Sequence, residues 1–242
     1  MSAVMISHAS QGASISYSVS MALTRNAGIT INTVAPNINN NVTTVSVNNA
    51  STTRKLLDYI YDKEGRGYED EYTKPPTDQS TKYGIDLATF KLGARSTLEF
   101  EPSLTNLKTL SQKSADKFYI NYYLTPYNLD KITNFSILNA LFSQEPLGEV
   151  RMMRSAKSAL NAVAGTNYSI NVKPFSSAEI NSLNIAESKK YINTFGSYQY
   201  NSYMNLYNRN PKKYGAWING WISRLNEILI NVKYKYVKKV KK

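Results

Sequence analysis

The sequence predicts an α+β fold, in which strands dominate the first part of the chain and helices the second. Residues 13–23 alternate apolar side chains with serines, which is the period of a half-buried strand. Trp217, Trp221 and Leu225 recur four positions apart, which is the period of an amphipathic helix. The predicted elements do not follow each other in a regular βαβ series, so the sequence favours α+β over a parallel α/β fold.

The N-terminal region, residues 1–61, is predicted to be rich in strands. Its apolar residues and its turns indicate three strands, at 13–23, 29–34 and 42–47. Because short turns join them, we expect an antiparallel meander. Near the end of this region, Thr52 or Thr53 can cap a short helix that carries Leu56, Leu57 and Ile60.

Residues 62–82 are predicted to form a polar, acidic loop between the N-terminal region and the rest of the chain. Glycines and prolines interrupt any regular pattern there. The loop contains an acidic patch of Glu69, Asp70 and Glu71. Its sign is opposite to that of the C-terminal tail, so we interpret it as a candidate contact between identical copies of the chain.

Residues 83–242 are predicted to form an α+β body that, with the preceding regions, makes one folded domain. Strands are predicted at 85–87, 98–100, 118–124, 147–153 and 168–172, and helices at 104–110, 126–142, 156–164, 179–195, 198–210 and 217–229. Three local signals support helix ends: Pro126 at a first helical position, Gly165 as a C-terminal cap, and Ser176 with Glu179 as a capping box.

Basic residues are concentrated at the C-terminal end. The chain has a formal net charge of +12, and from Lys212 onward nine basic residues face one acidic residue, Glu227. Such a balance favours an anionic partner. Candidate polyanion contacts are Lys212, Lys213, Lys233, Lys235, Lys238, Lys239, Lys241 and Lys242. Candidate stacking or interface residues are Tyr203, Tyr207, Tyr214, Tyr234 and Tyr236, for which packing in a core or an interface is favoured over base stacking.

Several kinds of chemistry are excluded or unsupported by the sequence. The chain has no cysteine, which excludes thiol chemistry. Its one histidine, His8, excludes a multi-histidine metal site and is the only residue that could serve as the histidine base of a catalytic triad. No phosphate-binding loop or Gly-x-Ser-x-Gly motif occurs. Glu99 and Glu101 alternate on a predicted strand but are interpreted as solvated surface carboxylates. We therefore expect no cofactor.

The sequence also lacks an apolar run that would span a membrane and a recognisable secretory signal. Its abundance of Asn, Tyr, Lys and Ile is typical of an AT-rich coding genome, as in many phages. The leading hypothesis is a non-enzymatic structural subunit of a repeating assembly, such as a connector, ring or shell protein of a phage or virus particle. Its partners would be copies of itself and other particle proteins, located in the virion or the cytoplasm.

Two alternatives remain open. One is a nucleic-acid-binding protein of the nucleocapsid type, which would use the basic tail and the tyrosines. The other is an enzyme of a type without a recognisable motif, which acidic side chains converging in the folded protein would favour.

Overall fold

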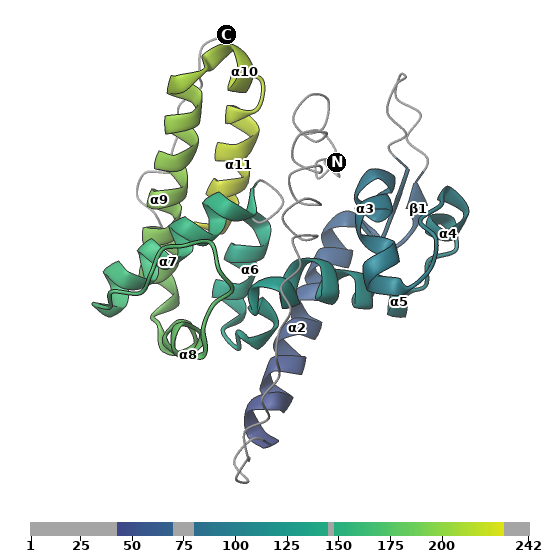
Figure 1. Cartoon of the computed structure of the whole chain (residues 1–242), viewed down its shortest axis with the longest axis horizontal. Helices are drawn as coiled ribbons and strands as arrows, with labels where there is room; N and C mark the ends of the chain where they lie inside the picture. The colour runs from purple at the N-terminus through teal and green to yellow at the C-terminus, as the bar shows by residue number, and fades with distance from the viewer. Residues whose placement is uncertain (1–42, 70–79, 145–147, 230–242) are drawn as a thin grey trace. The chain divides into compact units, whose positions relative to one another are not determined.

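The chain is described from a computed structural model that covers residues 43–69, 80–144 and 148–229. It divides into two compact units, Met1–Tyr122 and Tyr123–Lys242. The division falls inside the segment that the sequence predicts as one body. The described residues are mostly helical, with one small antiparallel sheet of three strands (Figure 1).

The described residues of the first unit form four helices and the small sheet. In chain order these are α2 (Thr43–Glu64), β1 (Tyr68–Glu69), β2 (Thr81–Lys82), β3 (Ile85–Asp86), α3 (Leu87–Leu98), α4 (Leu104–Lys108) and α5 (Gln112–Tyr119). The strands lie in the order β1-β2-β3, with Tyr68 opposite Lys82 and Lys82 opposite Ile85. Short polar side chains start the later helices: Asp86, Ser103 and Ser111 each accept a hydrogen bond from a backbone N–H of the first turn.

Aromatic rings form much of the core of the first unit. Phe118 stacks on Tyr122 at a ring-centroid distance of 5.0 Å and lies 6.1 Å from Phe90. Gly93 of α3 faces these rings, and a Cβ at this position would lie 2.4 Å from the Tyr122 ring. A glycine is therefore required for α3 to approach α5 this closely.

A π-helix, Ile120–Leu124, follows α5 and leads into the second unit. That unit contains two 3-10 turns, Thr125–Tyr127 and Leu129–Lys131, then α6 (Phe135–Gln144), α7 (Glu149–Ala164), α8 (Ser177–Ile185), α9 (Ser188–Arg209), α10 (Pro211–Tyr214) and α11 (Ile218–Ile228). Helices α9 and α11 run side by side and are joined by α10 (Figure 1). We call α9, α10 and α11 the C-terminal hairpin.

Several local signals in the sequence correctly mark helix ends. Gly165 ends α7 with a φ of 66°. Ser176 and Glu179 make both hydrogen bonds of a capping box at the start of α8. Pro126, by contrast, lies in a three-residue 3-10 turn, and the helix predicted over 126–142 begins only at Phe135. These signals depend on neighbours within a few residues of the chain, so they do not need tertiary structure.

Most of the predicted strands that fall on described residues are wrong. Helical structure covers 43–47, Leu98, 118–124 and 149–153, and residues 168–172 form no regular element. Short stretches of alternating apolar residues do not distinguish a strand from a helix that is buried on several sides. Phe118, Tyr119, Tyr122 and Leu124 illustrate this, because all four are buried although they lie in helical turns.

The helix at 56–60 is confirmed, but it belongs to α2, which begins at Thr43 rather than at Thr52 or Thr53. The helix predicted over 179–195 is interrupted between α8 and α9. The strands predicted at 13–23 and 29–34 and the basic tail from Lys233 lie outside the described residues. None of the described helices is long and apolar enough to cross a membrane.

Candidate acid–base site

Glu64 is the last residue of α2, and its side chain is half-buried. Gly65 follows with a φ of 84°, and its N–H donates to the carbonyl of Tyr61 over 3.0 Å. This is the left-handed turn that commonly ends a helix. The free carbonyls of a long helix make its C-terminal end negative, and Glu64 lies at this end of α2.

The turn between β2 and β3 lies directly against Glu64. A Cβ placed on Gly84 would lie 2.7 Å from the Glu64 Cβ and 3.1 Å from the hydroxyl of Tyr119. Gly84 also has a φ of 73°, and the preceding Tyr83 has a φ of 53°. Both residues thus occupy the left-handed region, which is unfavourable for a tyrosine and is often found at functional sites.

Tyr119, the last residue of α5, supplies a hydroxyl beside the same turn. The hydroxyl donates to the carbonyl of Tyr83 over 2.9 Å. Burial raises the pKa of Tyr119 above its usual value, and the charges of Glu64 and Asp86 raise it further. The phenol therefore lies in the field of two carboxylates. It is also the residue before the π-helix, a type of irregularity that recurs at functional sites.

Asp86 is the second carboxylate of this group. It ends β3, and its side chain accepts hydrogen bonds from the Thr89 N–H over 2.7 Å and from the Thr89 hydroxyl over 2.9 Å. The two carboxylates therefore have opposite surroundings. Glu64 lies at the negative end of α2, whereas Asp86 caps the positive end of α3.

Tyrosine rings surround these groups. The ring of Tyr61 lies 5.3 Å from that of Tyr83 and 6.1 Å from that of Tyr119. We call Glu64, Tyr83, Gly84, Asp86 and Tyr119 the Glu64 site. All five residues belong to the first unit.

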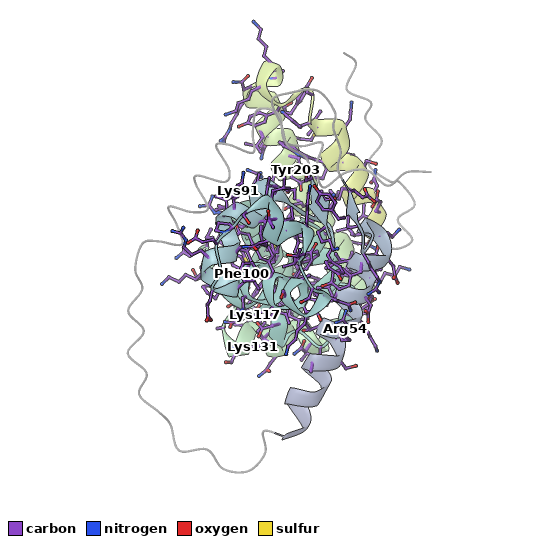
Figure 2. All side chains as sticks on the ribbon, turned by 90° about the vertical axis from the view of Figure 1, so that its right-hand side faces the viewer. Arg54, Lys91, Phe100, Lys117, Lys131 and Tyr203 are labelled. Carbon is purple, nitrogen blue, oxygen red and sulfur yellow. The ribbon has the colours of Figure 1, made fainter. Side chains whose placement is uncertain are left out.

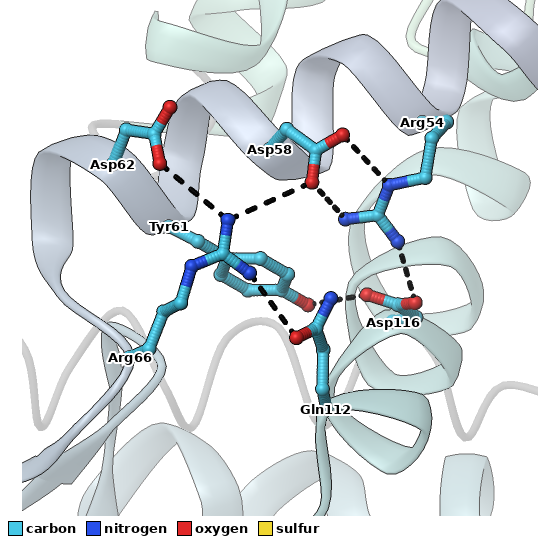
Figure 3. Close-up of polar contacts among 7 residues, drawn as sticks. All are labelled: Arg54, Asp58, Tyr61, Asp62, Arg66, Gln112 and Asp116. Atoms are coloured by element: carbon cyan, nitrogen blue, oxygen red, sulfur yellow. Dashed lines mark hydrogen bonds and ion pairs between the residues drawn. The ribbon is translucent and has the colours of Figure 1, made fainter.

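A polar network fixes α2 against α5 and so positions the site (Figure 3). Arg54 donates to Asp58 and, over 2.7 Å, to Asp116 of α5. Asp116 also accepts a hydrogen bond of 2.6 Å from the hydroxyl of Tyr61, which is 1% exposed. Hydrogen bonding from Arg54 lowers the pKa of Asp58, although desolvation opposes this effect.

Arg66 extends the network beyond the end of α2. It donates to Gln112 over 3.1 Å and to Asp62 over 3.4 Å (Figure 3). Tyr61, Asp62 and Arg66 flank Glu64 in the chain, so the network holds the last turn of α2 and the residues after it. The network therefore holds the backbone on either side of Glu64 against α5.

The residue types at the Glu64 site limit its chemistry to proton transfer and charge stabilisation by carboxyl and phenol groups. The chain has no cysteine, and its one histidine lies outside the described residues. Among residues 43–69, 80–144 and 148–229, no group of three metal-ligating side chains occurs. Asp116 lines an open cleft of about 480 Å³ with Phe100, Lys113 and Lys117, but Glu64 is not one of the residues lining it.

The structure separates the acidic residues considered from sequence. Glu99 and Glu101 are exposed and pair with Lys117 and Arg95 respectively, which agrees with their interpretation as surface carboxylates. Glu69 of the acidic patch is exposed, and Asp70 and Glu71 lie outside the described residues. Sequence reasoning missed Glu64 and Tyr119. The glycine after Glu64 is a signal in the sequence that a helix ends there. Tyr119 lies in the segment 118–124, which the sequence predicts as a strand.

The candidate polyanion and stacking residues also differ in their surroundings. Lys212 and Lys213 are exposed. Tyr207 and Tyr214 are half-buried against the core of the C-terminal hairpin. Tyr203, which is labelled in Figure 2, is fully buried in the hydrophobic core of the C-terminal hairpin. The remaining candidates, Lys233, Lys235, Lys238, Lys239, Lys241, Lys242, Tyr234 and Tyr236, lie outside the described residues.

Comparisons with known proteins add little. No protein-family model matches the chain, and no curated protein matches it. Among solved structures, the chain is similar to one described as the structure of Brucella abortus SagA, with 18% sequence identity and a TM-score of 0.49. That match covers 74% of this chain and 92% of the other. A similarity of this size carries no argument about function.

Proposed function

We propose that this chain cleaves glycosidic bonds, with Glu64 as the general acid. The observation that carries the proposal is the placement of Glu64 at the C-terminal end of α2, with its Cβ and Cγ against Gly84 and its charge acting, together with that of Asp86, on the phenol of Tyr119. Pairs of carboxyl groups in contrasting surroundings are the usual means by which glycoside hydrolases separate their acid from their charged partner.

Each carboxyl group has a role that follows from its surroundings. In the proposed reaction the carboxyl group of Glu64, in its protonated form, gives its proton to the departing glycosidic oxygen. Asp86, held by Thr89, offers a negative charge that can stabilise the positive charge developing on the sugar ring; water then adds to the anomeric carbon and returns a proton to the Glu64 carboxylate. Tyr119, whose hydroxyl donates to the Tyr83 carbonyl, holds the β2–β3 turn at the site.

The residue types favour this chemistry over other hydrolytic reactions. A cysteine nucleophile is absent from the chain, and the Glu64 site includes no histidine that could activate a serine. Glycoside hydrolysis needs neither, because two carboxyl groups suffice. Among the tyrosines near Glu64, half-buried Tyr83 has a ring face and a hydroxyl edge that suit a polyhydroxylated substrate.

The first prediction tests Glu64 directly. We expect Glu64→Gln to lower hydrolysis by about 10²–10⁴-fold, the range for loss of a general acid, because glutamine has no proton to transfer. The assay measures reducing ends released from purified peptidoglycan, chitin, cellulose and xylan between pH 4 and 8. Glu99→Gln is the matched control, because Glu99 is exposed and lies outside the site.

Two results would contradict the proposal. One is that Glu64→Gln hydrolyses the active polysaccharide as fast as the Glu99→Gln control. The other is that the wild-type protein releases no more reducing ends from any of these polymers than Glu64→Gln does.

The hypotheses of a particle subunit and of a nucleic-acid-binding protein stay predictions. A structural subunit of a phage or virus particle can also carry a hydrolytic site, so the assembly hypothesis is compatible with the proposal. A strictly non-enzymatic role is not compatible with the proposal. The comparison of Glu64→Gln with the wild type distinguishes a hydrolytic protein from a non-enzymatic one.

A further inference from the structure

The C-terminal hairpin contains a long stretch without acidic side chains. Between Ser188 and Asn226 the chain has no Asp or Glu. The same stretch carries six basic residues, which are Lys189, Lys190, Arg209, Lys212, Lys213 and Arg224. The Glu64 site belongs to the other unit, so a role for these cations does not rest on the proposed hydrolytic function.

The tip of the C-terminal hairpin gathers three of these cations. Arg209 ends α9, and Lys212 and Lys213 lie in α10. All three side chains are exposed, and none forms an ion pair with the residues that the structure describes. A cation at the end of α9 offsets the helix dipole. The dipole alone does not account for two further lysines side by side.

The tip is held by backbone bonds and by the core beneath it. The Asn210 side chain accepts from the Lys213 N–H over 3.0 Å, and the Gly215 N–H donates to the Pro211 carbonyl over 2.8 Å. Tyr214 packs against Trp221 at a ring-centroid distance of 5.9 Å. A backbone fixed in this way loses little conformational freedom when the cations meet a ligand.

Neutral polar groups surround the cations. Asn205, Asn208 and Asn210 are exposed at the same end of the hairpin. Amides donate hydrogen bonds to phosphate oxygens without adding negative charge. None of the large hydrophobic side chains exposed on the described residues lies between 205 and 217, so a lipid-inserting face is not indicated at the tip.

We propose that the tip of the C-terminal hairpin binds a linear phosphodiester polymer through Arg209, Lys212 and Lys213. Lysines act as point charges toward phosphates along such a chain, and binding of this kind releases counterions. The chemistry is shared by single-stranded nucleic acid and by a poly(glycerol phosphate) chain. The surface does not depend on the basic tail, which can be removed separately.

The test measures binding of fluorescein-labelled dT20 to the full chain by fluorescence anisotropy between 50 and 200 mM salt. We expect Arg209→Gln/Lys212→Gln/Lys213→Gln to weaken binding roughly tenfold or more at low salt. It should also reduce the slope of log K against log salt by about 2, which corresponds to three lost phosphate contacts on a single strand. The matched control is Lys55→Gln/Lys91→Gln/Lys113→Gln, which removes the same charge from exposed positions in the first unit.

Further arms make each outcome decisive. If unlabelled poly(glycerol phosphate) displaces labelled dT20, the phosphodiester backbone is the feature recognised. If only unlabelled dT20 displaces it, the site is specific for nucleic acid. Equal affinity and slope in the triple variant and its control would overturn the proposal. Binding that is lost only when residues 230–242 are deleted, or binding to anionic vesicles without binding to dT20, would also overturn it.

Discussion

At the residue scale, three tyrosines are held in surroundings that oppose their ionisation. Burial raises the pKa values of Tyr61, Tyr119 and Tyr191, and hydrogen bonding to Asp116 adds to the effect at Tyr61. The hydroxyl of Tyr191 donates to the carbonyl of Ala156 over 3.2 Å, which links α9 to α7. Each hydroxyl therefore has a structural use only in its protonated form.

This predicts a loss of stability in alkali. A tyrosine whose pKa is raised in the folded protein contributes stability that is fully present below the pKa of the unfolded chain, about 10, and is lost as pH rises beyond it. We expect the free energy of unfolding in urea to be level below about pH 9 and to fall steeply above about pH 10.

Absorbance of phenolate near 295 nm should rise together with this loss, because the buried tyrosines ionise on unfolding. Tyr191→Phe removes one titrating group, so its stability should fall less steeply with pH than that of the wild type. A free energy of unfolding that stays constant to pH 11 would contradict the conclusion that these tyrosines have raised pKa values in the folded protein.

At the element scale, the carboxylate of Glu179 holds helix α8 through two interactions. Glu179 closes the capping box with Ser176, and its side chain also lies 3.0 Å from the ammonium of Lys157 on α7. These two charged side chains are only 4% and 6% exposed. Removing one partner of a buried pair leaves the other charge without compensation.

We therefore expect Glu179→Ala to lower the free energy of unfolding by about 3–5 kcal/mol. Ser176→Ala, which removes only the capping hydroxyl, should cost about 1 kcal/mol. Urea unfolding followed by circular dichroism measures both. Equal effects of the two substitutions would show that the Lys157 pair contributes nothing beyond the cap.

At the scale of the whole molecule, each of the two units has a core of its own. In the first unit Phe90, Phe118 and Tyr122 pack together, and in the second Tyr191 and Phe195 stack in parallel. Units with separate cores can unfold as separate cooperative transitions.

We predict two thermal transitions in calorimetry. Asp116→Ala, which leaves Arg54 and the Tyr61 hydroxyl without their shared acceptor, should lower one transition by several degrees. Glu179→Ala should lower the other. A single transition that both substitutions shift equally would show that the chain unfolds as one unit.

Local signals in the sequence determined the helix ends and the amphipathic C-terminal helix. Ser103, Gly165 and the Ser176–Glu179 box act through hydrogen bonds or backbone angles within three or four residues, so they can be recognised without a fold. Composition likewise determined that cysteine chemistry is absent and that positive charge gathers near the C-terminus.

Only the tertiary structure decided which residues meet. Glu64, Gly84 and Tyr119 are 20 and 35 residues apart in the chain, and they come together because α2, the β2–β3 turn and α5 pack on one another. The helical state of 118–124 was decided in the same way. Its alternating apolar residues fit a strand, but burial on several sides fits helical turns better, and burial depends on the whole unit.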